Sequence, residues 1–73
     1  MKVIINDREI VIFRGATVGE AVRMYSGFSY KKLLTGYLVV QDRFGYRTEP
    51  DGPVMEGQHF YLKVSSPENI KTK

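Results

Sequence analysis

The sequence predicts an α+β fold, in which a mixed sheet of four to five strands packs against one main helix. Three observations lead to this class: short β-branched runs near both ends, one segment with helical spacing of apolar residues, and glycines spread between the apolar runs. The 73 residues are too few for a second core and a linker. We therefore expect a single domain over residues 1–64 and a flexible tail over residues 65–73.

The first strands are expected to form a β-hairpin. Residues 2–5 are mostly β-branched, Asn6-Asp7 supplies turn residues, and residues 9–13 form the second strand. Because side chains alternate along a strand, one face of this hairpin is apolar. That face carries Val3, Ile5, Ile10 and Ile12.

The strongest local signal in the chain is a capping box. Thr17 and Glu20 have the spacing at which each side chain bonds the backbone N–H of the other residue. Apolar residues follow at positions i, i+3, i+4 and i+7, one stripe of an amphipathic helix, namely Val18, Ala21, Val22 and Tyr25. Gly27 is expected to end this helix, and residues 29–34 are expected to add a helical turn closed by Gly36.

Further strands are predicted at residues 37–41 and 59–64, with a short edge strand at 46–48. The chain between the first and last strands is long enough for a crossover, so these two strands can pair in parallel at the sheet centre. One helix on such a sheet is a β-grasp, or ubiquitin-like, arrangement. Its expected core comprises Val3, Ile5, Ile10, Ile12, Val18, Val22, Tyr25, Leu38, Val40, Phe60, Leu62 and Val64.

Four segments carry a resemblance to a known family: residues 1–7, 15–22, 37–41 and 54–62. They resemble the ubiquitin-like sulfur carriers of thiamine and molybdopterin biosynthesis, and they are also similar to the small TGS modules of RNA-linked enzymes. The resemblance implies a β-grasp scaffold. Sulfur carriers act through a C-terminal Gly-Gly, whereas no glycine follows Gly57 here. The resemblance therefore implies an atypical sulfur carrier as one alternative function and an RNA-associated module as a second.

Composition excludes several chemistries. Without cysteine the chain has no disulfide, no thiol nucleophile and no cysteine-ligated zinc or iron–sulfur cluster. The net charge of +3 is modest and scattered, so nucleic acid is not the expected partner. The chain contains neither a membrane-length apolar run nor a secretory signal, so we expect a cytoplasmic protein without membrane contact.

Catalytic and metal-binding groups are sparse. His59 is expected to be a solvated residue at a strand end, because no acid is placed beside it. The carboxylates of Glu49, Asp51 and Glu56 match no calcium-binding spacing, and the loop that contains them is explained by turn formation. The serines have no histidine at a suggestive spacing. We therefore expect no enzyme activity, no cofactor and no metal.

The outer sheet face is the candidate site. Strand alternation places five apolar residues opposite the core, with Gln41, Arg43 and Lys63 at their rim. These five are Ile4, Val11, Phe13, Val39 and Tyr61. They either form a binding patch or are ordinary scattered surface residues. We interpret them as a site for a protein partner or a second copy of the chain, with Phe13 and Tyr61 as aromatic anchors.

Overall fold

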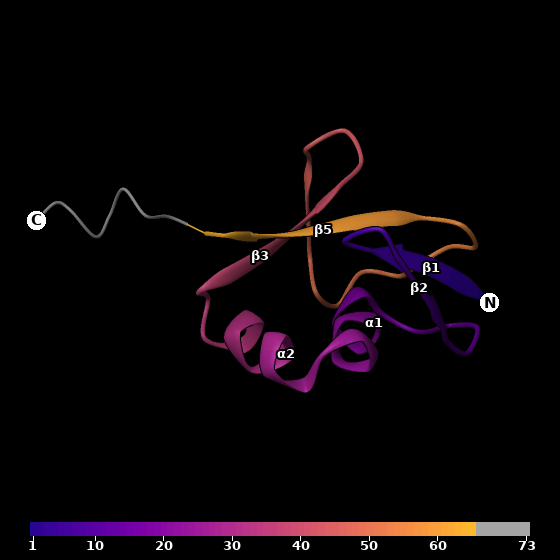
Figure 1. Ribbon diagram of the computed structural model, residues 1–73, viewed down its shortest axis with the longest axis horizontal. Coiled ribbons are helices and arrows are strands. Elements are labelled where there is room, and N and C mark those ends of the chain that lie inside the picture. Colours follow the sequence, from indigo (N-terminus) through magenta and orange to yellow (C-terminus); the bar gives the residue numbers. More distant parts are fainter. Residues whose placement is uncertain (66–73) are drawn as a thin grey trace, which may run out of the picture.

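The computed structural model describes residues 1–65, which form a five-stranded mixed sheet with two helices on one of its faces (Figure 1). The elements are β1 (Lys2–Ile5), β2 (Arg8–Val11), α1 (Val18–Tyr25), α2 (Gly27–Leu34), β3 (Leu38–Asp42), β4 (Arg47–Thr48) and β5 (His59–Val64). The strand order is β2-β1-β5-β3-β4, and β1 and β5 are parallel at its centre. The α+β class is confirmed, as is the parallel pairing of the first and last strands.

The turn between β1 and β2 has the predicted two residues. Asn6 and Asp7 have φ angles of 50° and 66°, and the flanking residues Ile5 and Arg8 are paired across the hairpin. Two successive positive φ angles are the mark of a type I′ turn, whose twist suits a hairpin. Asparagine and aspartate tolerate this left-handed conformation better than most residues do, which explains their place here.

Asn6 also ties the hairpin to β5. Its backbone N–H donates to the Phe60 carbonyl at 3.0 Å, and its side-chain Oδ1 accepts from the Leu62 N–H at 3.1 Å. Its Nδ2 donates to the Tyr25 hydroxyl of α1 at 3.3 Å. Since β1 ends at Ile5, the Asn6 side chain bonds a β5 amide that lies beyond the last paired residue of β1.

The capping box forms as predicted. The Thr17 hydroxyl accepts from the Glu20 N–H at 3.2 Å, and the Glu20 carboxylate accepts from the Thr17 N–H at 2.8 Å. The first two amides of α1 bond the long loop instead: Val18 donates to the Gly52 carbonyl at 2.9 Å, and Gly19 donates to the Pro50 carbonyl at 2.7 Å. The first turn of α1 is therefore docked on residues 50–52.

The prediction for the region after α1 was wrong in extent. Gly27 does not end the first helix; it begins a second helix of eight residues. Ser26 separates the two helices, because its N–H donates to the Val22 carbonyl while its hydroxyl caps α2 by accepting from Ser29. The burial of Leu33 gives α2 an apolar contact with the core, which a single surface turn would lack.

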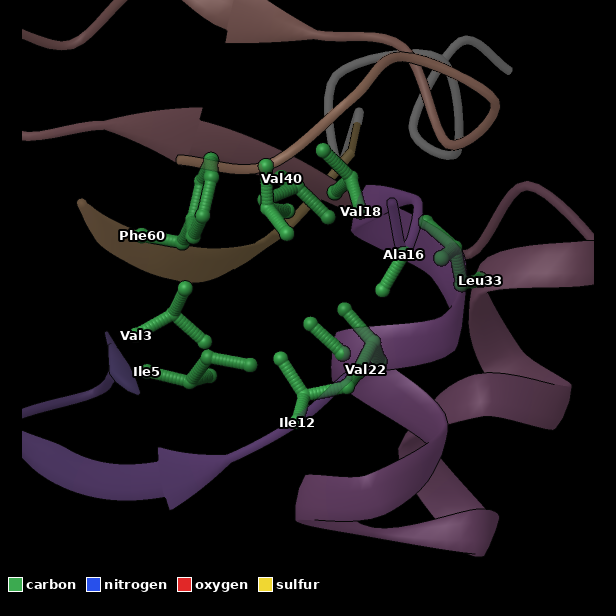
Figure 2. Packing of buried hydrophobic residues seen from close by; sticks show 11 residues of the cluster. Val3, Ile5, Ile12, Ala16, Val18, Val22, Leu33, Val40 and Phe60 are labelled. Carbon is green, nitrogen blue, oxygen red and sulfur yellow. The ribbon is translucent and has the colours of Figure 1, made fainter. Parts of the chain in front are cut away.

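The core lies between the sheet and the helices, with side chains of the strands pointing toward α1 (Figure 2). Most of the expected core residues are buried or pack against the core. Leu38 and Val64 are the exceptions, and they are paired in the last rung of the β3–β5 ladder. Leu38 is half-buried outside the core cluster, and Val64 remains 46% exposed. The expected core lacks four residues that are buried: Ala16, Ala21, Leu33 and Val54.

Strand boundaries differ from expectation by one or two residues. β2 ends at Val11 rather than residue 13, β3 is shifted by one residue, and β4 contains two residues rather than three. Ser65 donates from its N–H to the Tyr37 carbonyl and from its hydroxyl to the Gly36 carbonyl. The remainder of the expected flexible tail, residues 66–73, lies outside the described part of the chain.

Candidate functional site on the outer sheet face

Both helices cover the same face of the sheet, and the opposite face is uncovered by any helix of the described chain (Figure 1). We call this opposite side the outer face. Pairing registers and burial define its side chains as those that alternate with the buried residues of each strand. They are Lys2 and Ile4 on β1, Glu9 and Val11 on β2, Val39 and Gln41 on β3, Arg47 on β4, and His59, Tyr61 and Lys63 on β5.

Four of the five predicted residues lie on one diagonal of this face, which we call the apolar stripe. It runs through Val11, Ile4, Tyr61 and Val39 on the four strands β2, β1, β5 and β3. The registers place Lys2 opposite Val11, His59 opposite Ile4 and Gln41 opposite Tyr61. On each successive strand the stripe residue lies two residues away from that opposite position, always toward the same end of the sheet. Diagonal neighbours of this kind are about 8 Å apart between Cα atoms, within reach of long side chains.

The fifth predicted residue, Phe13, does not lie on a strand. β2 ends two residues earlier, and the Phe13 carbonyl accepts from the Ala16 N–H in a turn. From the registers, Val11 at the end of β2 and Tyr61 are separated by four residue steps, or about 13 Å along the strand direction, and Phe13 follows Val11 beyond the end of the strand. Phe13 and Tyr61 are thus too far apart to act as the paired anchors of one small patch.

Charged residues flank the apolar stripe. The Lys2 ammonium lies 3.9 Å from the Glu9 carboxylate, and this exposed ion pair connects the two sides of the stripe between Ile4 and Val11. Val11 is 68% exposed, whereas Ile4 is half-buried. The outer face is accordingly a mixed surface, in which apolar contact area is narrow and bordered by charge.

Tyr61 is the best-fixed member of the stripe. Its hydroxyl donates to the Asp7 carboxylate at 3.2 Å. Asn6 hydrogen-bonds the residues on either side of it, at the Phe60 carbonyl and the Leu62 N–H. The side chain is half-buried. Since its position is fixed at both the backbone and the hydroxyl, the ring can contact a partner with little further loss of conformational entropy.

Three cations surround Gln41 beside the stripe, and we call Gln41, Arg43, Arg47 and Lys63 the basic corner. Arg47 is paired with Gln41 across β3 and β4, while Lys63 is paired with the adjacent stripe residue Val39. Within residues 1–65, none of the three cations lies within 4.0 Å of a carboxylate. Arg43, Arg47 and Lys63 are all exposed, so their charges face solvent.

The basic corner contains a hollow of about 300 Å³. Its lining includes Gln41, Asp42, Arg43, Tyr61 and Lys63. The Oδ1 atom of the Asp42 carboxylate accepts from two backbone amides of the β3–β4 turn, each at 2.9 Å. The Asp42 charge is thus partly used by the turn, and the hollow retains an excess of positive groups.

His59 departs from the expectation of a solvated histidine. It lies on the outer face at the start of β5, but it is half-buried and its Nδ1 is shielded from solvent without a hydrogen-bond partner among the described residues. A second hollow of about 240 Å³ lies beside it, lined also by Arg43 and Phe44. His59 therefore borders the basic corner rather than standing in open solvent.

Of the acidic residues weighed from the sequence, Glu56 has a structural role. Its carboxylate accepts from the Lys2 N–H with both oxygens at 3.3 Å. In the part of the chain that the structure describes, no three histidine or acidic side chains form a group that could hold a metal ion. No helix within the same residues is long and apolar enough to cross a membrane.

A rival surface lies on the helical side. The Lys32 ammonium lies 5.1 Å from the centroid of the Phe28 ring and 4.7 Å from that of the Tyr37 ring. Phe28 is largely exposed and Tyr37 is about half exposed, and Leu34 is exposed nearby in sequence. The cation–π contacts already pair the positive charge of this group, whereas the cations of the basic corner have no such partner within the described chain.

Sequence reasoning missed Arg47, because alternation along a two-residue edge strand does not show which residues of the neighbouring strand it pairs with. It also missed Phe44 and Tyr46, two exposed aromatic residues of the β3–β4 turn. The position of Asp42 was the available signal for this turn, since an aspartate side chain commonly bonds the backbone two residues on.

Comparison of the chain with protein-family models, with curated proteins and with solved structures finds no match in any of the three.

Proposed function

We propose that this chain is a non-catalytic β-grasp protein of the ubiquitin-like type that binds another protein through the apolar stripe of its outer sheet face. The single observation that carries the proposal is the stripe itself: four apolar side chains on four neighbouring strands, on the face that no helix within residues 1–65 covers. The groups of the stripe and of the basic corner offer contact area, hydrogen-bond donors and positive charge, which are the features by which a protein surface binds another protein.

The β-grasp assignment is supported by the topology. A parallel pair of terminal strands at the centre of a mixed sheet requires a crossover, and here that crossover contains both helices on one face. The order β2-β1-β5-β3-β4 then leaves β2 and β4 as the edges. The resemblance drawn from the sequence agrees with this arrangement.

The size of the face predicts a weak and transient complex. The five strands contain between two and six residues. With a rise of about 3.3 Å per residue and a spacing of about 4.8 Å between strands, they give an outer face of roughly 330 Å². A stable complex buries about 800 Å² on each partner. The expected dissociation constant is therefore on the order of micromolar or weaker, unless the partner also contacts the edges of the sheet.

Site-specific photo-crosslinking tests this function. A photoreactive benzoylphenylalanine replaces Tyr61 or, in a second protein, Val39, and each protein is expressed and irradiated in cells of its source. The matched control carries the same group at Phe28, an exposed aromatic position on the helical side. We expect both sheet-face positions to crosslink to the same protein, and the control to give no such product.

The same experiment identifies the occupant. The substitution Val11→Glu is expected to reduce crosslinking from position 61 at least fivefold without unfolding the chain, since Val11 is largely exposed. Crosslinking from Phe28 but not from the sheet face would contradict the proposal. A crosslinked product of twice the chain mass from position 61 would show that the partner is a second copy of this chain and not a different protein.

A further inference from the structure

We propose that the basic corner binds acidic side chains of an extended partner segment whose apolar side chains cover the neighbouring stripe. This inference rests on the proposed function and specifies the chemistry of the partner. Arg43, Arg47 and Lys63 provide the charge, and Tyr61 and Val39 provide the adjoining apolar contacts. The occupant is thus an extended peptide segment in which the side chains that face the sheet are alternately acidic and apolar.

Charge complementarity carries the inference. Arg43 and Lys63 line one hollow, and Arg47 is paired with Gln41, which also lines it. Asp42 lines the hollow too, but its carboxylate is engaged by the amides of Phe44 and Tyr46. Within the described chain no acid pairs with the three cations. A ligand that brings negative charge lowers the repulsion among them, whereas a neutral ligand leaves it in place.

The spacing of the groups indicates an extended ligand. Lys63 is directly opposite the stripe residue Val39, and Tyr61 lies between Gln41 and the Asn6–Asp7 turn. Successive positions along β3 and β5 that face outward are two residues apart, or about 6.6 Å. An extended peptide presents every second side chain to one surface at the same interval, so an acidic residue at position i and an apolar residue at position i+2 can meet the corner and the stripe together.

Single-stranded RNA is the other anionic polymer that a basic surface with nearby aromatic rings can bind. One feature favours the peptide. Stripe contacts are mostly aliphatic, with Tyr61 as the one ring and its hydroxyl held by Asp7, so the stripe offers few rings on which bases could stack.

Titration of the ¹⁵N-labelled full chain with synthetic probes tests the inference. The first probe is the eight-residue peptide Glu-Ser-Val-Ser-Glu-Ser-Val-Ser, in which every second residue is alternately Glu or Val; the second replaces each Glu by Gln; the third is an eight-nucleotide uridine RNA. We expect the Glu peptide to shift the amide resonances of Gln41, Arg47 and Lys63, and to bind at least tenfold more tightly than the Gln peptide. Raising salt from 50 to 300 mM should weaken its binding.

Matched variants locate the charge contacts. Lys63→Gln and Arg47→Gln are each expected to weaken Glu-peptide binding by about three- to fivefold. Lys31→Gln removes an exposed charge from α2, on the other side of the sheet, and should leave binding unchanged. Equal binding of the Glu and Gln peptides, or equal effects of Lys31→Gln and Lys63→Gln, would overturn the inference.

Two further outcomes separate this inference from the proposed function. Tighter binding of the RNA than of the Glu peptide would indicate that the basic corner binds a nucleic acid and not an acidic peptide segment, and would overturn the inference. If position 61 crosslinks to a protein with the same yield in Lys63→Gln and in the unaltered chain, the stripe binds a partner and the basic corner does not. The proposed function then stands while the inference fails.

Discussion

Replacement of Asn6 by glycine tests the contact that joins the hairpin to β5. Glycine adopts the φ of 50° without strain, so Asn6→Gly chiefly removes the side-chain hydrogen bonds to the Leu62 N–H and the Tyr25 hydroxyl. Both bonds are exposed, and water replaces part of what is lost. We expect a loss of about 1 kcal/mol in the free energy of unfolding.

Asn6→Ala separates the bonds from the backbone strain. Alanine loses the same two bonds and must also hold a positive φ, which adds about 1 kcal/mol, so its total loss should be about 2 kcal/mol. Urea unfolding followed by circular dichroism measures both losses, and the slope with denaturant should stay constant. In a domain of this size each kcal/mol lowers Tm by about 4–8 °C.

Amide hydrogen exchange provides the residue-specific measurement. In Asn6→Gly the Leu62 amide should exchange faster by more than the amides of the other β5 residues, because its acceptor is gone. Asp7→Gly is the control: it keeps the turn conformation and removes only the bond from the Tyr61 hydroxyl, so Leu62 exchange should follow the rest of β5. The reasoning fails if Leu62 exchange is unaltered in Asn6→Gly, or if the alanine variant is as stable as the glycine variant.

Two pairs of substitutions test the helices, each by thermal unfolding. Gly27→Ala should stabilise the chain by about 0.5 kcal/mol, because a Cβ there meets no atom within 4 Å, whereas Gly19→Ala should destabilise it by about 1 kcal/mol, because its Cβ would lie 3.2 Å from the Pro50 carbonyl oxygen. A stabilising Gly19→Ala would show that the loop is not docked on α1. Leu33→Ala should cost about 3 kcal/mol and Leu34→Ala less than about 0.5 kcal/mol, since the first side chain is buried and the second is exposed. Similar costs for the two would contradict the placement of α2.

Local chemistry explains which elements could be predicted. The Asn6–Asp7 turn and the Thr17–Glu20 capping box each depend on groups within three residues of one another, so their signals are contained in short stretches of sequence. The extent of α2 depends instead on the burial of Leu33 against a core assembled from distant segments. Gly27 by itself indicates a helix end. It becomes a helix start because Ser26 caps α2 and because Leu33 contacts the core.

For the candidate site, the sequence predicts which side chains of each strand face outward, but not which of them are neighbours across strands. Alternation along each strand correctly assigns Ile4, Val39 and Tyr61 to the side opposite the core. The order and register of the strands decide which of them are neighbours, and a single sequence does not state either. Phe13 shows the limit, because alternation continued through it in the sequence while the turn to Ala16 ends β2 at Val11.

Register makes the site depend on the turn that stabilises the fold. A shift of β5 by two residues would keep Tyr61 on the outer face, but it would move the ring away from the diagonal next to Ile4. Asn6 opposes such a shift, because its N–H and its side chain bond β5 at Phe60 and at Leu62, on either side of Tyr61. Asp7 then holds the Tyr61 hydroxyl. The two turn residues therefore fix both the parallel pairing at the centre of the sheet and the position of the central ring of the apolar stripe.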